Sequence, residues 1–198
     1  MYNLNTQEKI RNYILSSSEI VRSSVLLAPN IEKSIKAIVK CLRKGNKVVL
    51  FGNGGSAADA QHIAAEFIGR FKINRKSLPA IALSNNSSTI TAISNDFSFD
   101  MVFSRQCESL ISKGDVVIGI STSGNSLNVK KGINTSKKNG AITIGLLGNK
   151  GGSIKKCVDI PLIVNSTSTP HIQEVHRTIY HIVCEIVEKE LVESSRKK

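Results

Sequence analysis

Apolar positions follow two different patterns along the chain. From about Thr6 to Leu42 they recur at helical spacing, and Pro29 predicts a break between two helices. Beyond residue 46, short apolar and β-branched runs alternate with longer amphipathic segments, as expected for strands separated by helices. The expected strands are residues 47–51, 80–83, 116–120, 141–147 and 158–164, and the expected helices are residues 55–71, 88–94, 99–112, 126–138 and 170–193.

This alternation favours a parallel sheet covered by helices on both faces, because parallel strands need crossover connections and are buried on both sides. We therefore predict one α/β domain over residues 1–198, built on a doubly wound parallel sheet of five strands. Residues 1–45 are expected to form a helical N-terminal extension, and residues 46–198 the α/β core. Short Gly-containing connections inside the core are expected to be turns, not domain boundaries.

Two of the expected strands end in turns of small polar residues. The first is Gly52-Asn53-Gly54-Gly55-Ser56, and the second is Ser121-Thr122-Ser123-Gly124-Asn125-Ser126. A helix is expected after each turn, so free backbone N–H groups and hydroxyls converge where the helix dipole favours an anion. In doubly wound sheets ligands bind at the carboxyl ends of the strands, where both turns fall. The sequence therefore predicts a site for a phosphorylated small molecule.

Two other phosphate-binding motifs do not fit the sequence. No Gly-x-x-x-x-Gly-Lys-Ser/Thr is present, which argues against a P-loop nucleotide hydrolase. The run from Gly52 has Ala57 in the place of the third glycine of Gly-x-Gly-x-x-Gly, which weakens a dinucleotide-binding interpretation.

The composition of the chain argues against nucleic acids and membranes as binding partners. The formal net charge is +12, but the basic residues are scattered, Trp is absent and aromatic residues make up 5%, so no nucleic-acid platform is predicted. The charge is expected to solvate helix faces and to attract anionic metabolites. No apolar stretch reaches the roughly 18 residues of a membrane helix, and no secretory signal is apparent. The cysteines are widely spaced, so reduced thiols in a cytoplasmic protein are expected; they are Cys41, Cys107, Cys157 and Cys184.

Candidate proton-transfer groups lie on the helix expected after the first turn. Asp59, His62 and Glu66 gather on one face at spacings of three and four residues. An imidazole and carboxylates just beyond an anion-binding turn suit general acid–base chemistry. The alternative is a solvated polar face in which Glu66 pairs with a basic neighbour such as Arg70.

The last expected helix carries two further histidines. His176 lies at the edge of the apolar stripe formed by Ile172, Val175, Ile179, Ile182, Val183, Ile186 and Val187. It is expected to be a partly buried packing residue. His181 lies roughly opposite that stripe, where it would meet water or another subunit.

Together these motifs resemble the phosphoheptose isomerases, which are sugar-isomerase (SIS) domain proteins with a flavodoxin-like sheet. The resemblance covers nearly the whole chain, in order and with compatible spacing; it rests on residues 51–56, 59–62, Glu66, 95–97, 119–126, 172–176 and His181. It implies a ketose–aldose isomerase that converts sedoheptulose 7-phosphate to D-glycero-D-manno-heptose 7-phosphate through an enediol. That reaction is the first step toward ADP- or GDP-heptose, for lipopolysaccharide or capsule.

The resemblance also implies roles for individual residues. Glu66 and His181 match the proton-transfer pair. Residues matching substrate contacts are Asn53, Gly54, Gly55, Ser56, Glu66, Asn95, Asp96, Ser121, Thr122, Ser123, Ser126 and Gln173. Zinc, one ion per subunit, would be held by His62, Glu66, Gln173 and His181. The resemblance further implies a homotetramer with sites at subunit interfaces.

The sequence departs from the family pattern before Gln173, where Ser168 and His171 replace a common acid and arginine. Two other functions stay open at this point. One is a non-catalytic SIS protein that binds the bacterial replication initiator; such a relative lacks residues matching Glu66 and His181, so their presence favours the enzyme. The other is a regulatory domain that binds a sugar phosphate without converting it.

Overall fold

The computed structural model describes residues 5–196, and it contains one parallel sheet of five strands. The strand order is β2-β1-β3-β4-β5, which confirms the predicted doubly wound α/β fold. The strands are β1 (Val48–Gly52), β2 (Ala80–Ala82), β3 (Val116–Ser121), β4 (Ile142–Leu147) and β5 (Ile160–Ile163).

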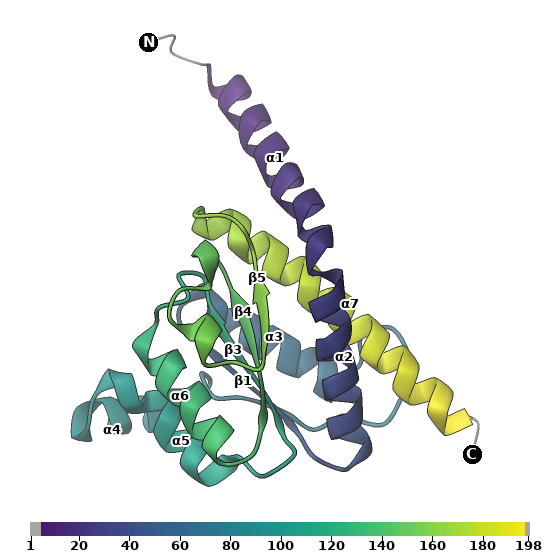
Figure 1. Cartoon of the computed structure of the whole chain (residues 1–198), viewed down its shortest axis with the longest axis vertical. Coiled ribbons are helices and arrows are strands. Elements are labelled where there is room, and N and C mark those ends of the chain that lie inside the picture. Colours follow the sequence, from purple (N-terminus) through teal and green to yellow (C-terminus); the bar gives the residue numbers. More distant parts are fainter. Residues whose placement is uncertain (1–4, 197–198) are drawn as a thin grey trace.

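Helices cover both faces of this sheet (Figure 1). On one face lie α2 (Ala28–Arg43), α3 (Gly55–Ile68) and α7 (Thr169–Arg196), and on the other lie α5 (Val102–Leu110) and α6 (Leu127–Lys138). The remaining helical elements are α1 (Thr6–Ser23), α4 (Ser87–Asp96) and the short 3-10 segments η1 (Ser24–Leu27), η2 (Phe99–Met101), η3 (Asn149–Gly151) and η4 (Ile154–Lys156). No helix within the described part of the chain is long and apolar enough to cross a membrane.

Strand β1 shows why the strands read as continuous apolar runs. Val48 and Leu50 pack into the core under α2, α3 and α7, whereas Val49 and Phe51 pack into the core under α5 and α6. Successive side chains point to opposite faces, and here both faces are covered, so each position is apolar. The Phe51 ring stacks on Phe103 of α5, with 4.9 Å between ring centroids.

The N-terminal helices differ from the prediction in two ways. The break falls at η1, before Pro29, and Pro29 lies in the first turn of α2, where its missing N–H costs no helical hydrogen bond. Helix α2 also contributes Ile35 and Ile38 to the main core, so residue 45 does not divide an extension from the core. Helix α1 has no buried residue and projects from the body of the molecule (Figure 1).

Helix α3 ends at Ile68, three residues earlier than predicted, because Arg75 takes up its last carbonyl groups. Arg75 Nη2 donates to the Glu66 carbonyl and Nη1 to the Phe67 carbonyl, both at 2.9 Å. Arg75 Nε lies 3.0 Å from Glu188 of α7, and both side chains are almost fully buried. Glu188 also accepts the backbone N–H groups of residues 71–73. This buried ion pair joins the end of α3 to α7.

Candidate active site

Strands β1 and β3 are neighbours at the point where the strand order reverses, which is where open α/β sheets bind ligands. Gly52 at the end of β1 pairs in register with Ile120 near the end of β3. The two predicted turns, which follow these residues, therefore lie beside each other at one edge of the sheet. The sheet topology thus brings together the two turns of the predicted anion site, which are about seventy residues apart in sequence.

The second turn brings three hydroxyl groups together at the start of α6. Ser121 Oγ lies 3.0 Å from Ser126 Oγ and 3.4 Å from Ser123 Oγ. Ser126 is the residue before α6, and its side chain makes no capping hydrogen bond to the helix. Hydroxyls and free N–H groups at a helix N-terminus suit a phosphate group. Thr122 lies half-buried within this turn.

The first turn is shaped by glycine and by a pair of amides. Gly54 has a φ of +53°, a conformation that favours glycine, and it precedes α3. Gly55 lies against Gln173 of α7, since a Cβ at Gly55 would stand 2.3 Å from the Gln173 amide nitrogen. Asn53 and Asn128 exchange two side-chain hydrogen bonds of 2.9 Å each, which tie this turn to α6.

Asn128 lies beside the predicted substrate contacts, and the sequence prediction missed it. It is buried, and its amide fixes Asn53, one of the predicted substrate contacts. The sequence did contain one indication of this contact, which is an amide side chain in the first turn of the helix that follows the serine-rich turn. Ser56, another predicted contact, is also buried, next to the Gly52 backbone.

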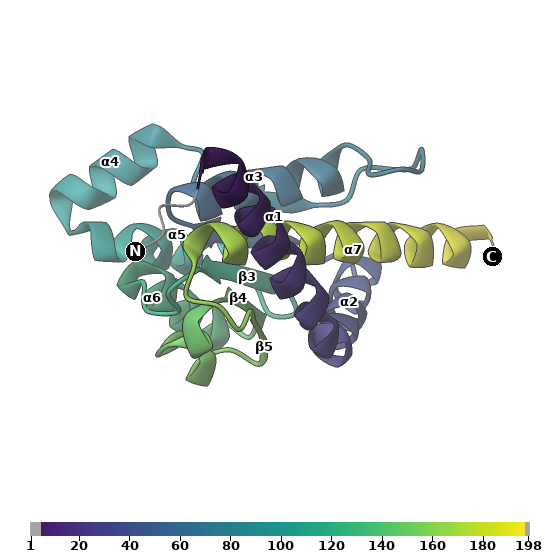
Figure 2. The same cartoon turned by 90° about the horizontal axis from the view of Figure 1, so that it is seen from above.

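The acid and imidazoles of the prediction gather between α3 and α7, which lie side by side (Figure 2). His62 Nε2 lies 3.0 Å from Glu66 Oε1, so Glu66 pairs with this histidine and not with Arg70, as the alternative interpretation would have it. The His181 ring stands edge-on to the His62 ring, with 5.4 Å between centroids. The two halves of the predicted proton-transfer pair, 115 positions apart, thus share one cluster.

His181 is not a free surface residue. Its ring is half-buried and contacts the rings of Tyr180 and Phe71 as well as His62. Burial lowers the pKa of His181, and the neighbouring His62 lowers it further. At neutral pH the His181 imidazole is therefore neutral, with one nitrogen able to accept a proton and the other able to donate one.

The rest of the last helix agrees only in part with the predicted apolar stripe. His176 is fully buried as a packing residue; its Nε2 bonds to the Leu147 carbonyl, and burial lowers its pKa to about 4. Ile182 and Ile186, assigned to the stripe, are 40% and 37% exposed. They face α2 across a surface groove and do not enter the core.

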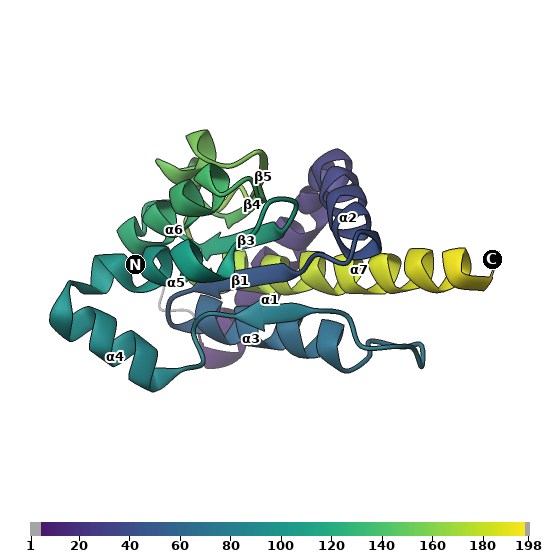
Figure 3. The same cartoon turned by 90° about the horizontal axis from the view of Figure 1, so that it is seen from below.

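The other predicted contacts stand apart from this cluster. Asn95 donates to Asp96 at 2.9 Å; both are exposed at the end of α4, which packs on η2 and α5 and stands out from the molecule (Figure 3). His171, one of the departures from the family pattern, packs its ring on Tyr13 of α1 at 4.7 Å. That departure therefore lies at the contact between α1 and α7.

The zinc prediction fits one chain only in part. The 3.0 Å between His62 Nε2 and Glu66 Oε1 is somewhat shorter than the roughly 3.4 Å that separates two ligands of a tetrahedral zinc ion with bonds near 2.1 Å. Within residues 5–196, however, no three His, Cys, Asp or Glu side chains are arranged as a complete metal-binding group. Gln173 packs against Gly55 at the start of α3, and it lies eight residues, about 12 Å of helix, before His181. Within one chain, therefore, His62 and Glu66 lie close to ligand spacing and His181 lies near them. Gln173, the fourth predicted ligand, lies apart from these three residues.

The predicted anion site and the acid–imidazole cluster are also separated. Helix α3 starts beside the two turns at Gly55 and reaches Glu66 eleven residues later, a rise of about 16 Å along the helix axis. Helices that follow parallel strands run back toward the amino ends of those strands. Glu66 therefore lies well away from the serine hydroxyls of its own chain.

Comparison with known proteins gives a consistent result. Residues 12–148 match the SIS domain family. The chain is 54% identical over 165 residues to the phosphoheptose isomerase of a Geobacter species, covering 83% of this chain and 86% of that relative. It is 58% identical to the enzyme of that name from Pelobacter propionicus over 154 residues, 78% and 82% of the two chains. The solved phosphoheptose isomerase of Neisseria gonorrhoeae superposes with a TM-score of 0.89 at 36% identity, over 93% of this chain and all of that one.

Proposed function

Because the chain belongs to the SIS domain family and, within it, to the phosphoheptose isomerases, we propose that it interconverts sedoheptulose 7-phosphate and D-glycero-D-manno-heptose 7-phosphate. The observation that carries the proposal is the single cluster of Glu66, His62 and His181, formed by two helices distant in sequence. The test is incubation of the purified protein with sedoheptulose 7-phosphate, with and without a chelator, followed by analysis for the aldose. A regulatory domain would bind the ketose without converting it. A protein that binds the replication initiator would neither bind nor convert the ketose.

The proposed mechanism assigns the carbon-bound proton to Glu66. Its carboxylate removes a proton from carbon 1 of the open-chain ketose while the oxygen on carbon 2 gains one, which gives the enediol. Glu66 then returns its proton to carbon 2, and the oxygen on carbon 1 loses one to give the aldehyde. The neutral His181 imidazole suits the oxygen protons and ring opening, because it can both accept and donate near neutral pH.

The serine-rich turn is proposed to hold the phosphate through Ser121, Thr122, Ser123 and Ser126. Binding energy from this remote group orients the reacting carbons without taking part in the chemistry. The first turn, through Asn53, Gly54, Gly55 and Ser56, and the residues Asn95, Asp96 and Gln173 are proposed to orient the sugar hydroxyls.

Removing hydroxyls from the serine-rich turn should weaken substrate binding more than turnover. Ser121→Ala and Ser123→Ala each delete a hydroxyl that faces the N-terminus of α6, and each should raise KM by about 10- to 150-fold, since one hydrogen bond to a charged group contributes about 1.5–3 kcal/mol. Steady-state kinetics with the heptose phosphate measure the effect. A loss confined to kcat, with KM unchanged, would argue against the phosphate assignment.

Substrate length supports an active site shared between copies of the chain. Carbon 2 lies seven bonds from phosphorus, which is at most about 9 Å in an extended chain with bonds near 1.5 Å. That is shorter than the rise from Gly55 to Glu66, about 16 Å. We therefore propose that the serine-rich turn of one copy faces the Glu66 and His181 of another.

The same arrangement accounts for Gln173. Gln173 lies beside the first turn of its own chain, so it would approach the zinc ligands His62, Glu66 and His181 of a neighbouring copy. Bound there, zinc would polarise the oxygens of the substrate. Whether it is needed for turnover is what the chelator arm of the assay measures.

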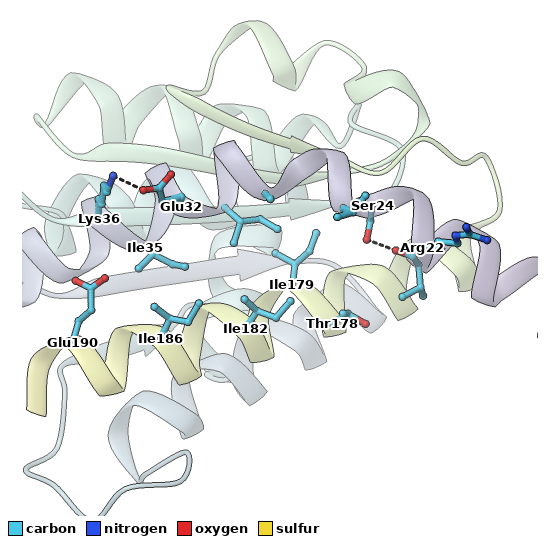
Figure 4. A pocket seen from close by; sticks show the side chains of 14 residues that line it. Arg22, Ser24, Glu32, Ile35, Lys36, Thr178, Ile179, Ile182, Ile186 and Glu190 are labelled. Carbon is cyan, nitrogen blue, oxygen red and sulfur yellow. Dashed lines mark hydrogen bonds and ion pairs between the residues drawn. The ribbon is translucent and has the colours of Figure 1, made fainter. Parts of the chain in front are cut away.

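Exposed apolar surface offers area for such an assembly. A groove of about 530 Å³ runs between α2 and α7 and is lined by Ile35, Ile179, Ile182 and Ile186 (Figure 4). On α1 and η1 the exposed apolar side chains are Ile10, Tyr13, Ile14, Leu15, Val25 and Leu26. Surfaces of this kind mark contacts between proteins, and we propose a homotetramer.

Mixing two inactive variants should restore activity if the site is shared. Glu66→Gln removes the base, and Ser123→Asp places a negative charge at the exposed part of the phosphate turn. In an equal mixture, each shared site takes its turn from one copy and its Glu66 from another, and each has about one chance in two of being intact. About one quarter of the sites would therefore combine an intact turn with an intact Glu66. Activity is measured after co-expression, with light scattering to verify the tetramer. Mixed tetramers no more active than either variant, or a monomer at micromolar concentration, would reject the shared site.

The product is proposed to supply a heptose for nucleotide activation, toward lipopolysaccharide or capsule. The cytoplasm is the proposed compartment. The four cysteines are free thiols, and three of them are buried with a pKa raised to about 11 or 12, which is consistent with a reducing environment.

A further inference from the structure

A buried tyrosine connects the acid–imidazole cluster to a second carboxylate. The Tyr180 hydroxyl lies 3.2 Å from His62 Nδ1 and 3.4 Å from Asp59 Oδ1. Tyr180 and Asp59 are both 2% exposed. Arg177 donates from Nε to the Tyr180 oxygen at 3.0 Å and approaches Asp59 with Nη2 at 3.4 Å. None of the roles assigned above to the phosphate turn or to the proton-transfer pair uses Tyr180 or Arg177.

Counting protons shows what this contact can do for His62. The Tyr180 oxygen accepts from Arg177, and its single proton goes either to Asp59 or to His62 Nδ1. When the phenol donates to Nδ1, the His62 proton is on Nε2 and points at Glu66. When the phenol donates to Asp59, Nδ1 carries the proton and donates to the phenol oxygen, and the Nε2 lone pair is free for a cation.

We propose that Tyr180 is a positioning residue that fixes the His62 ring with Nε2 directed at Glu66, and that Asp59 and Arg177 hold the phenol in place. This inference rests on the proposed function, in which His62 is a zinc ligand. In metal-binding histidines generally, a carboxylate or carbonyl bonded to the second ring nitrogen fixes the orientation and the tautomer of the ring. The Tyr180 hydroxyl occupies the same place beside His62 Nδ1. Here the partner is a phenol, with a carboxylate behind it.

The surroundings favour a polar role over simple packing. A phenylalanine would fill the same volume at position 180, so packing alone does not require the hydroxyl. Asp59 is a carboxylate buried within α3, and its recorded partners are Tyr180 and Arg177. Burying that charge is costly unless it is hydrogen-bonded, so the phenol and the guanidinium stabilise Asp59 while Asp59 orients the phenol.

The test compares Tyr180→Phe with a matched control, Tyr13→Phe, which removes an exposed phenol 3.5 Å from Glu174. The first readout is the ¹⁵N NMR spectrum of the histidine rings in the metal-free protein, with His62 assigned from a His62→Gln variant. In the metal-free wild type, with the Nε2 proton directed at Glu66, Nδ1 should be an unprotonated nitrogen that accepts a hydrogen bond from Tyr180; in Tyr180→Phe its resonance should move downfield, to that of a free acceptor. The control should leave it unchanged.

The second readout is zinc affinity, measured by competition with a chelator. Tyr180→Phe should weaken binding by about 10- to 100-fold, as loss of a hydrogen-bond partner on a ligating histidine does, and Tyr13→Phe should not. An Nδ1 resonance that is the same in Tyr180→Phe and in the wild type would overturn the inference. Failure of the wild type to isomerise the heptose phosphate or to bind zinc would instead reject the proposed function, since the metal-free spectrum tests the Tyr180 contact separately.

Discussion

Glu66→Gln is expected to lower kcat for heptose phosphate isomerisation by about 10²- to 10⁴-fold, the usual contribution of a general base. The amide keeps the shape of the side chain and can still accept a hydrogen bond from His62, but it cannot take a proton from carbon. Its side chain is 22% exposed in the single chain, so the substitution should leave the fold intact.

His181→Ala should reduce kcat over a similar range, because no other group at that position can move the oxygen protons. Matched controls exist for both changes. Glu108→Gln alters an exposed carboxylate on α5, and His171→Ala removes an imidazole at the contact between α1 and α7. Steady-state kinetics and circular dichroism are measured for all four variants. Turnover within tenfold of the wild type, in either Glu66→Gln or His181→Ala, would reject the assignment of that residue.

Arg75→Met is expected to destabilise the fold by about 3 kcal/mol, at the lower end of the range for breaking a buried ion pair. The loss leaves Glu188 without its charged partner and frees the carbonyls of Glu66 and Phe67 at the end of α3. The three backbone N–H groups that still bind Glu188 keep the effect from being larger. For a chain of this length the melting temperature should fall by about 6–12 °C.

An exposed pair provides the control for this prediction. Lys36 and Glu32 form an ion pair whose side chains are 68% and 64% exposed, so solvent screens their attraction and Lys36→Met should leave the melting temperature close to that of the wild type. Thermal unfolding is compared at one protein concentration, because assembly makes melting concentration-dependent. Equal melting temperatures for the two variants would mean that the Arg75–Glu188 pair does not anchor α3 to α7.

The carboxyl of Glu188 adds a pH dependence to this stabilisation. Burial alone would raise its pKa, but the N–H groups of residues 71–73 and the charge of Arg75 lower it below the ordinary value of 4.5. A lowered pKa in the fold means that the stabilisation is present above pH 4.5 and is lost as the pH falls through the folded value.

Local patterns were enough to predict the sheet and the two polar turns at the carboxyl ends of β1 and β3. Strand β1 reads as an apolar run because it is buried on both faces, and the glycines and serines that follow it mark the turn directly. The same information placed Asp59, His62 and Glu66 on one helix face, since side chains four positions apart are neighbours on any helix.

The parts that depend on how α3 packs against α7 could not be predicted in this way. Periodicity assigned Ile182 and Ile186 to the core and His181 to the opposite face, yet α7 turns His181 toward α3 and leaves the two isoleucines in a groove. The contacts of Tyr180 with His62 and Asp59 likewise join positions more than a hundred residues apart. No spacing within either helix indicates such contacts.

The resemblance to a family placed Gln173 and His181 in one site, whereas a single chain keeps them at different places along α7. Under the proposed shared site, the family pattern reflects residues that meet between copies, whereas the fold of one chain shows only the residues that meet within it. The distance between the phosphate turn and Glu66 is the physical reason why the two descriptions differ, and a site shared between copies reconciles them.

The most direct test of the account follows sedoheptulose 7-phosphate in heavy water by NMR, with the wild-type protein beside Glu66→Gln. If Glu66 moves a proton between carbons 1 and 2, the wild type should form the aldose with deuterium at carbon 2, and the variant should leave the ketose unchanged. An unaltered spectrum with the wild-type protein, or equal deuterium incorporation by both proteins, would contradict the claim that this cluster performs the isomerisation.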